Sequence, residues 1–412
     1  MTRVYDVCHG CRLCFKFCTA FPSLFEMIDA HEDQDAGKLT AAEQDRVVHE
    51  CFNCKLCYVN CPYVPGQHEW AIDFPRLMLR AEAVHHAEGK VPARARLTDQ
   101  ALGRTDLLGA VGSLGAPAVN KLTGTPGSLP RKVMEKVTGV AAQRVLPPYA
   151  KERFSTWFKK RAHLRFDRRQ GRVALFPTCM VEYSDTAVGQ DLVRVYEHNG
   201  IECTLPEGQV CCGAPWLHSG DVKGFRRHAK KNLPILVKAI RDGCDIVVPE
   251  PTCSYVLKRD YKDYAPGADA ELVAANTYDA AEYLMKVHKG DGGGLDTTFT
   301  GPVPESITYH APCHLRAQNM GLRSRDLLRL TGTKVTVVAE CSGIDGTWGL
   351  RAENYEAARG VAKKMKTAMD AAGNDVIAGD CSLANGGIVE ETGITPMHPI
   401  RFIARAYGIA PG

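Results

Sequence analysis

Two runs of cysteines near the start of the chain share one spacing. In each run two residues separate the first three thiols, and a fourth thiol follows after three more residues. The runs are Cys8, Cys11, Cys14 and Cys18, and then Cys51, Cys54, Cys57 and Cys61. This spacing places four thiolates around a cubic iron–sulfur cluster. Zinc sites and disulfides are weaker alternatives, because zinc sites rarely use three such steps and disulfides need an oxidising compartment.

The assignment of thiols to clusters follows from the geometry of such repeats. In two-cluster ferredoxins the fourth thiol of each run binds the cluster of the other run. We therefore predict two 4Fe-4S clusters, the first held by Cys8, Cys11, Cys14 and Cys61, and the second by Cys51, Cys54, Cys57 and Cys18. Two clusters a short distance apart would form an electron path, so the chain is expected to work in a redox system.

The overall composition excludes several other classes of protein. The chain has 412 residues, 17 cysteines and a formal net charge of +4, which gives no preference for nucleic acid. No run approaches 18 apolar residues, so no transmembrane segment is expected. Many cysteines without a recognisable secretion signal favour a reducing, cytoplasmic compartment. Contact with the cytoplasmic face of a membrane stays open.

The pattern along the chain predicts four regions. The first is a helical two-cluster ferredoxin domain, with helices expected at 41–50 and 73–86, and a glycine-interrupted helical connector follows it. Strand and helix patterns then alternate in two further domains. The predicted boundaries are 1–90, 91–170, 171–290 and 300–412.

The end of the connector is strongly basic. Residues 151–172 hold nine Lys or Arg and two Asp or Glu, a net charge of +7. Phe154, Trp157 and Phe158 would share one face of a helix there. That helix would either rest on an anionic membrane or acidic partner, or pack its aromatic side chains against the next domain.

Short apolar runs from residue 171 onward each end just before a cysteine. Buried strands that alternate with helices predict an α/β fold with mainly parallel sheets, in which ligands gather at the carboxyl ends of the strands. The fold class is therefore multidomain, with a helical ferredoxin domain followed by two duplicated α/β domains. The runs lie at 173–177, 246–249, 307–310, 335–338 and 375–378.

The later cysteines form an internal repeat. Cys179, the run Cys211-Cys212-Gly213 and Cys253 correspond to Cys313, the run Cys341-Ser342-Gly343 and Cys381, at an offset of roughly 130 residues. In this pattern the chain resembles the CCG cysteine-rich family. That family includes iron–sulfur subunits of heterodisulfide reductase, of glycolate oxidase and of anaerobic glycerol-3-phosphate dehydrogenase.

The resemblance implies five thiolates per unit, and this chain departs from it in both units. In the first unit Glu250 stands where a cysteine is expected. In the second, Ser342 and Ala378 replace two cysteines. The first CCG site would then comprise Cys179, Cys211, Cys212 and Cys253, with Glu250 as an oxygen ligand, and the second only Cys313, Cys341 and Cys381.

The number of thiolates separates the two units chemically. Four thiolates can hold a four-iron cluster, whereas three leave one iron open. The second site would be vacant, or carry an open iron at which Cys313, Cys341 and Cys381 are candidate catalytic residues. It could also be completed by His310, His314, Ser342 or His398, or be a degenerate repeat kept for packing. Cys203 and Cys244 lie outside both patterns and are expected to be inert buried thiols.

Three functions fit this pattern. The leading hypothesis is an electron-transfer subunit that connects a flavoprotein dehydrogenase to the CCG site, or onward to a quinone. The second is a catalytic disulfide reductase at the CCG site, and the third is an electron donor to a rubrerythrin-type peroxidase. No dinucleotide or phosphate-binding motif is present, so flavin and nicotinamide would come from a partner.

Overall fold

The amino-terminal part of the computed structural model is helical. The structure describes residues 1–162, 170–290, 294–344 and 346–409. The first helices are α1 (Thr2–Cys11), α2 (Ala20–Asp29), α3 (Ala41–Glu50), α4 (Leu56–Val59) and α5 (Phe74–Ala87). Thr40 and Glu43 form a capping box that starts α3, since each side chain bonds the backbone N–H of the other. The two helices predicted in this region are confirmed.

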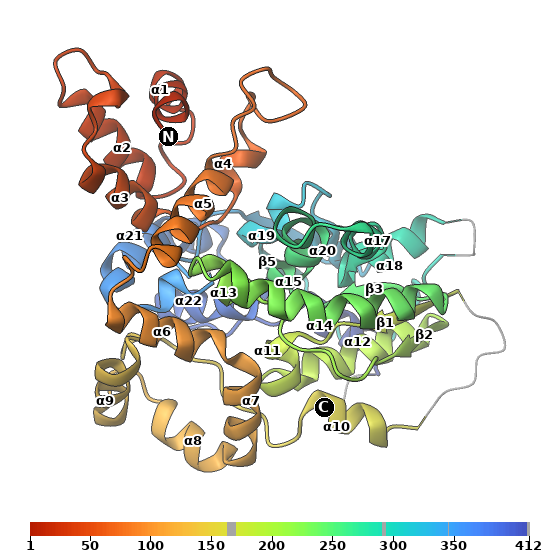
Figure 1. Ribbon diagram of the computed structural model, residues 1–412. Coiled ribbons are helices and arrows are strands. Elements are labelled where there is room, and N and C mark those ends of the chain that lie inside the picture. Colours follow the sequence, from red (N-terminus) through yellow and green to blue (C-terminus); the bar gives the residue numbers. More distant parts are fainter. Residues whose placement is uncertain (163–169, 291–293, 345, 410–412) are drawn as a thin grey trace.

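The connector consists of short helices, most of which lie at the opposite end of the molecule from α1 and α2 (Figure 1). They are α6 (Ala93–Gly103), α7 (Thr105–Leu114), α8 (Ala116–Thr123), α9 (Leu129–Thr138) and α10 (Phe154–Lys160). Phe154 and Phe158 of α10 are 1% and 7% exposed and belong to the core of the following α/β units. The aromatic face of the basic segment is therefore used for packing. Residues 163–169 of that segment lie outside the described residues.

The first α/β unit is built on a four-stranded parallel sheet in the order β2-β1-β3-β4. Its strands are β1 (Gly171–Leu175), β2 (Ile201–Thr204), β3 (Asp245–Val248) and β4 (Thr277–Asp279). Its helices are α11 (Thr178–Tyr183), α12 (Thr186–His198), α13 (Ala214–His218), α14 (Val222–Arg241), α15 (Pro251–Tyr255), α16 (Tyr261–Tyr264), α17 (Ala268–Ala275) and α18 (Ala280–Lys289).

The second unit repeats this arrangement with a three-stranded parallel sheet in the order β6-β5-β7. Its strands are β5 (Ser306–His310), β6 (Lys334–Val338) and β7 (Ile377–Gly379). Its helices are α19 (Cys313–Ala317), α20 (Arg323–Arg329), α21 (Tyr355–Ala372), α22 (Ser382–Thr392) and α23 (Pro399–Ala406). The central strands β1 and β5 occupy equivalent places, which confirms the duplicated α/β fold with parallel sheets.

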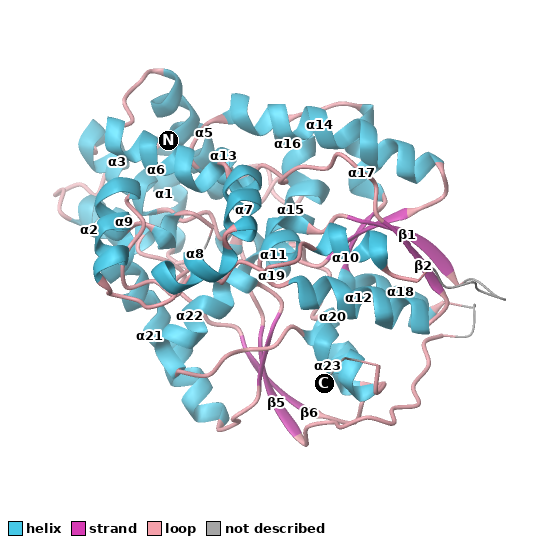
Figure 2. Cartoon of the chain, turned by 90° about the horizontal axis from the view of Figure 1, so that it is seen from below, coloured by secondary structure: helices cyan, strands magenta, loops and turns pink. Residues whose placement is uncertain are grey.

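Helices of both units pack between the two sheets (Figure 2). α12 contacts α23, and α18 contacts α20, so apolar residues of both units share one core. An ion pair between Arg401 and Asp191, with Nε and Oδ2 3.2 Å apart, joins α23 to α12. Among the described residues, no helix has the length and apolar character needed to cross a membrane.

Candidate iron–sulfur sites

The first group of ferredoxin thiols combines both cysteine runs. Burial and then the neighbouring thiols of Cys14, Cys61 and Cys11 raise the pKa of Cys8. Burial and then Cys61 and Cys11 raise the pKa of Cys14 to about 12. These thiols are therefore near enough to one another to interact electrostatically. The structure thus brings Cys61 to the three thiols of the first run.

The second group surrounds one small cavity of about 10 Å³. Its thiols are Cys18, Cys51, Cys54 and Cys57, and the rest of the lining is mostly apolar, namely Phe17, Phe21, Phe52, Phe74 and Pro75, with Asn53 and Lys55. The backbone is left-handed on both sides of Cys54, with φ of 56° at Asn53 and 65° at Lys55. Non-glycine residues rarely adopt this conformation, and it is frequent at functional sites. Four thiols in an apolar setting suit a four-iron cluster.

The four thiols of the first CCG unit form a connected group at the carboxyl ends of β1 and β3. The Sγ atoms of Cys253 and Cys212 are 3.2 Å apart. Hydrogen bonds from the thiols of Cys179 and Cys212 lower the pKa of Cys211 well below its usual value. Cys179, Cys211, Cys212 and Cys253 form no disulfide. Within the described part of the chain, no three His, Cys, Asp or Glu side chains are arranged to hold a single metal ion.

The loop that carries Cys211 and Cys212 is held from several directions. Asn232 Nδ2 donates to the Cys211 carbonyl at 3.2 Å, and Tyr261 Oη donates to the Cys212 carbonyl at 3.1 Å. Asp106 of α7 accepts a hydrogen bond from the Cys211 amide at 2.9 Å. The connector therefore contributes directly to this site, a role that no sequence spacing indicated.

The first CCG site opens to a cavity of about 520 Å³. Cys179 and Cys211 line this cavity together with Asp106 and Tyr183. Thr178, directly before Cys179, has a φ of +68°. This is a true outlier for a β-branched residue, and such strain persists only where the surrounding structure enforces it. Two thiols of the site, those of Cys179 and Cys211, therefore lie at the wall of this cavity.

Glu250 faces the second unit. It is 4% exposed, and its carboxylate accepts a hydrogen bond from the Ser382 amide at 3.2 Å and another from the Ser382 hydroxyl. Burial raises the pKa of this carboxyl to about 8. The predicted oxygen ligand thus has its hydrogen-bond partners in the other unit.

The second CCG unit keeps part of the geometry of the first. The Gly343 amide donates to Cys341 Sγ at 3.4 Å, just as the Gly213 amide donates to Cys211 Sγ at 3.5 Å. Ser342 replaces the second thiol of the pair, and its hydroxyl donates to the Ile344 carbonyl at 3.5 Å. Cys381, 9% exposed, precedes α22 at the end of β7.

Cys313 of the second unit meets a thiol of the ferredoxin region. Hydrogen bonds to Cys341 and Cys54, followed by burial, raise the pKa of Cys313 well above its usual value. Cys54 and Cys341 also share a buried apolar cluster with Phe52 and Leu56. The second ferredoxin site and the second CCG site are therefore direct neighbours.

The histidines proposed to complete the second site are all buried. His398 uses both ring nitrogens, at 3.0 Å from the Pro249 carbonyl and 3.1 Å from the Ile400 amide. His310 Nε2 lies 3.0 Å from the Glu340 carbonyl, while no described residue hydrogen-bonds its Nδ1. Of these two, His310 is the one with a ring nitrogen left for a metal.

His314 connects all three regions. Its Nε2–H donates to the Asn53 carbonyl at 3.1 Å, and its Nδ1 lies 3.0 Å from the Thr252 hydroxyl. Each of these three residues directly adjoins a predicted ligand thiol in the sequence. We call Asn53, Thr252 and His314 the junction. It holds the second ferredoxin site against both CCG units.

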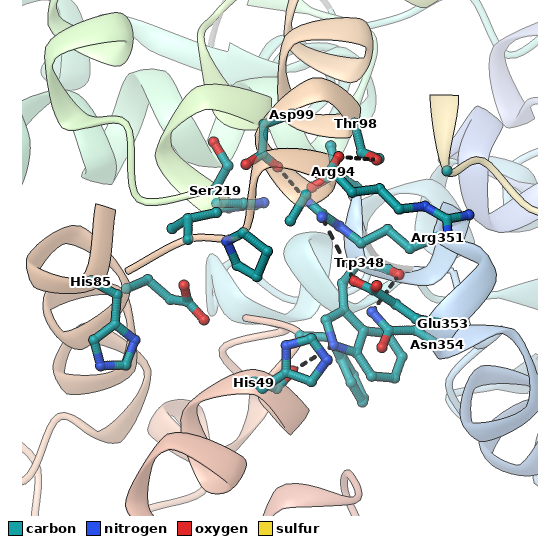
Figure 3. Close-up of a pocket in the computed structure, with 18 of the residues that line it drawn as sticks. His49, His85, Arg94, Thr98, Asp99, Ser219, Trp348, Arg351, Glu353 and Asn354 are labelled. Carbon is teal, nitrogen blue, oxygen red and sulfur yellow. Dashed lines mark hydrogen bonds and ion pairs between the residues drawn. The ribbon is translucent and has the colours of Figure 1, made fainter. Parts of the chain in front are cut away.

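A second attachment lies around a cavity of about 620 Å³ that Cys51 helps to line (Figure 3). Trp348 Nε1 donates to the His49 carbonyl at 2.7 Å, so the indole lies beside α3. An ion pair between Asp99 and Arg351 joins α6 to the second unit. The ferredoxin region is thus fixed to the second CCG unit at two separate places.

Comparison with known proteins agrees with this architecture. The family model of the CCG cysteine-rich domain matches residues 173–258 and 307–383, and that of the citrate utilization protein B Fer4-like domain matches 1–88. The chain is 28% identical over 316 residues to the C subunit of anaerobic glycerol-3-phosphate dehydrogenase from Escherichia coli (strain K12). This alignment covers 76% of the chain and 78% of the relative.

Lactate utilization protein A 1 of Bacillus cereus (strain AH820) is 30% identical over 241 residues, which cover 55% of the chain and 96% of the relative. Fold and sites together define an iron–sulfur electron-transfer subunit of oxidoreductases. The chain belongs to the family of CCG cysteine-rich proteins that includes lactate utilization protein A.

Proposed function

We propose that the chain holds three iron–sulfur clusters and relays electrons from the ferredoxin region, across the junction, to the first CCG site. The observation that carries this proposal is the hydrogen bonding of His314 to Asn53 and Thr252, which places the regions in contact. When bound, each cluster would store and pass on single electrons. The residues of the chain would fix the clusters relative to one another.

The proposed cluster ligands are the two groups of ferredoxin thiols and the four thiols of the first CCG unit. Cys8, Cys11, Cys14 and Cys61 would hold one cluster, and Cys51, Cys54, Cys57 and Cys18 another. Cys179, Cys211, Cys212 and Cys253 would hold the third. Glu250 would act on this third site from its place beside Ser382, as a buried acid rather than as a ligand, because its hydrogen-bond partners belong to the second unit.

The redox partner would be a flavoprotein dehydrogenase, since the chain has no dinucleotide-binding motif of its own. The Escherichia coli relative is by its name a subunit of a dehydrogenase. Electrons would enter at the ferredoxin region and leave through the cavity beside Cys179 and Cys211. A quinone or a redox protein could accept them there.

Iron analysis of anaerobically purified protein tests this proposal. Three four-iron clusters predict about 12 iron atoms per chain. Cys212→Ala should lower the iron content by between one and about four atoms, because only three thiolates would remain at the first CCG site. Cys203→Ala is the matched control, since Cys203 is buried in the core away from the thiol groups.

The relay itself is tested by rapid reduction followed by freezing and paramagnetic resonance. The ferredoxin signals should appear first and the signal of the first CCG site later, and Cys212→Ala should abolish only the later one. An iron content of about eight or less, or loss of iron in Cys203→Ala equal to that in Cys212→Ala, would contradict the assignment.

A further inference from the structure

One lysine is buried inside the second ferredoxin site. Lys55 lies between the predicted ligands Cys54 and Cys57 in the sequence, and it is 4% exposed. It lines the same small cavity as the four thiols of that site. Lysine side chains are almost never buried to this degree without a partner of opposite charge. The surroundings of Lys55 must therefore supply negative charge to its ammonium group.

The carboxylate that pairs with Lys55 belongs to the first CCG unit. Asp260 is 3% exposed, and its Oδ1 lies 3.9 Å from Lys55 Nζ. The same Nζ lies 5.5 Å from the centre of the Tyr255 ring. Asp260 ends a π-helix, η2 (Val256–Asp260), which continues α15 and its thiol Cys253. Such helices are rare and frequent at functional sites. The segment that follows a thiol of the first CCG site thus reaches the second ferredoxin site.

This ion pair is too loose to neutralise both charges. At 3.9 Å, Lys55 Nζ and Asp260 Oδ1 are farther apart than in a hydrogen bond. Among the described residues, Asp260 Oδ2 has no hydrogen-bond partner. Burial raises the pKa of the Asp260 carboxyl, and the charges of Lys55 and His314 oppose that rise. Because an incompletely paired buried charge is costly, further negative charge beside Lys55 would stabilise the site.

The thiols of the second ferredoxin site can provide this charge. Burial raises the pKa of the Cys51 thiol to about 12, and the Lys55 ammonium is among the groups that oppose this rise. The ammonium group is therefore near enough to act on a ligand of this site. Thiols that bind iron do so as thiolates, so a bound cluster would place several negative charges around Lys55. Each electron added to the cluster would increase that negative charge.

We propose that Lys55 is the counter-charge of the second ferredoxin cluster and that Asp260 limits its effect. This inference rests on the proposed cluster at that site. A buried positive charge stabilises the reduced cluster more than the oxidised one, and so it raises the reduction potential. Asp260 carries the opposite charge and therefore lowers the same potential. Through this one ion pair, the first CCG unit adjusts how strongly the ferredoxin region holds an electron.

The equivalent residue of the first cysteine run has a different setting. Arg12 and Lys55 both stand between the second and third thiols of their runs, and both have a left-handed backbone, with φ of 51° and 65°. The Arg12 side chain, however, is 46% exposed and pairs with Asp29 at 2.5 Å. Water screens such a surface charge. This difference favours an electron on the second cluster, which is the one held against the CCG units.

Redox titration of the anaerobic full-length protein, followed by paramagnetic resonance, tests the inference. Lys55→Met keeps a long apolar side chain but removes the charge. The second ferredoxin cluster should then be roughly tenfold harder to reduce, which is a fall of about 59 mV in its midpoint potential. Asp260→Asn keeps the shape of the side chain and should shift the same potential upward. The double variant should lie between the two single variants. Both shifts should persist at high salt, because buried charges are poorly screened.

Arg12→Met is the matched control and should leave the potential of the second cluster unchanged. Unshifted potentials in Lys55→Met and Asp260→Asn, or shifts of the same sign, would overturn the inference, since a packing defect does not follow the sign of the lost charge. If Lys55→Met loses its iron, Asp260→Asn decides alone, and the absence of an upward shift overturns the inference. Unshifted potentials in a protein with about 12 iron atoms per chain would leave the proposed relay standing.

Discussion

Replacing His314 by alanine tests the junction directly. The imidazole is 4% exposed and makes two hydrogen bonds, at 3.1 Å to the Asn53 carbonyl and 3.0 Å to the Thr252 hydroxyl. A hydrogen bond contributes about 1 kcal/mol, and the cavity left by the ring adds to that loss. We therefore expect the contact between the ferredoxin loop and the CCG units to weaken by about 2–3 kcal/mol.

Amide hydrogen exchange measures this change where it occurs. A loss of about 2–3 kcal/mol in the free energy of local opening speeds exchange roughly 30- to 160-fold. The effect should appear in peptides that span Phe52–Tyr58 and Pro251–Tyr255. In the same variant, the first CCG site should also be reduced more slowly, because the ferredoxin loop is no longer held against the CCG units.

Two further variants make the outcome specific. His314→Gln keeps a donor and an acceptor, so it should restore part of the protection. His288→Ala removes a partly exposed histidine near the end of α18, outside the junction, and should leave these peptides unchanged. If amide hydrogen exchange in both peptides is equally fast in the His314→Ala and His288→Ala variants, the junction does not hold the regions together.

Four other substitutions have calculable effects, each measured by urea unfolding of the anaerobic protein. Gly109→Ala should lower the free energy of unfolding by about 1–3 kcal/mol, because the new Cβ overpacks the helix. Gly360→Ala is the control: no atom lies within 4 Å of its new Cβ, so this variant should raise the free energy of unfolding by about 0.5–1 kcal/mol. Burial raises the pKa of Glu82 from 4.5 to about 7. The folded state therefore holds this proton more tightly than the unfolded state does. As a result, the free energy of unfolding falls by about 3 kcal/mol as the pH rises through that range. Glu82→Gln should remove this fall and be the more stable protein at pH 8. Glu390→Gln should cost about 3–5 kcal/mol, because it leaves the buried Arg144 guanidinium, 2.6 Å from Glu390, without its counter-charge.

Local patterns predict what depends on neighbours in the sequence. The cysteine runs, the capped helix at Ala41–Glu50 and the apolar strands β1, β3 and β5 are all readable, because spacing and burial follow directly from residue type. The strands β2 and β4 carry no such signal. Ile201–Thr204 alternates in burial and Thr277–Asp279 has three residues, so neither shows a continuous apolar run.

Contacts between distant segments cannot be predicted in the same way. Asp106 and Cys211 are 105 residues apart, and His314 and Asn53 are 261 residues apart. No spacing rule connects such pairs, since the packing of whole helices brings them together. The sequence marks His314 as a metal-ligand candidate, whereas its observed contacts are hydrogen bonds to the ferredoxin loop and to Thr252.

The junction also gives a physical reason for the unequal units. The second unit has lost thiols, yet it still attaches the ferredoxin region, through His314 and through Trp348. The first unit keeps four thiols and opens to a cavity at Cys179. In the proposed relay, replacing a thiol of the second unit would leave electron transfer intact as long as the ferredoxin region stays attached. Replacing a thiol of the first unit would instead remove the terminal cluster. Ser342 is tolerated for this reason, and we expect Cys212→Ser at the equivalent place to stop the relay.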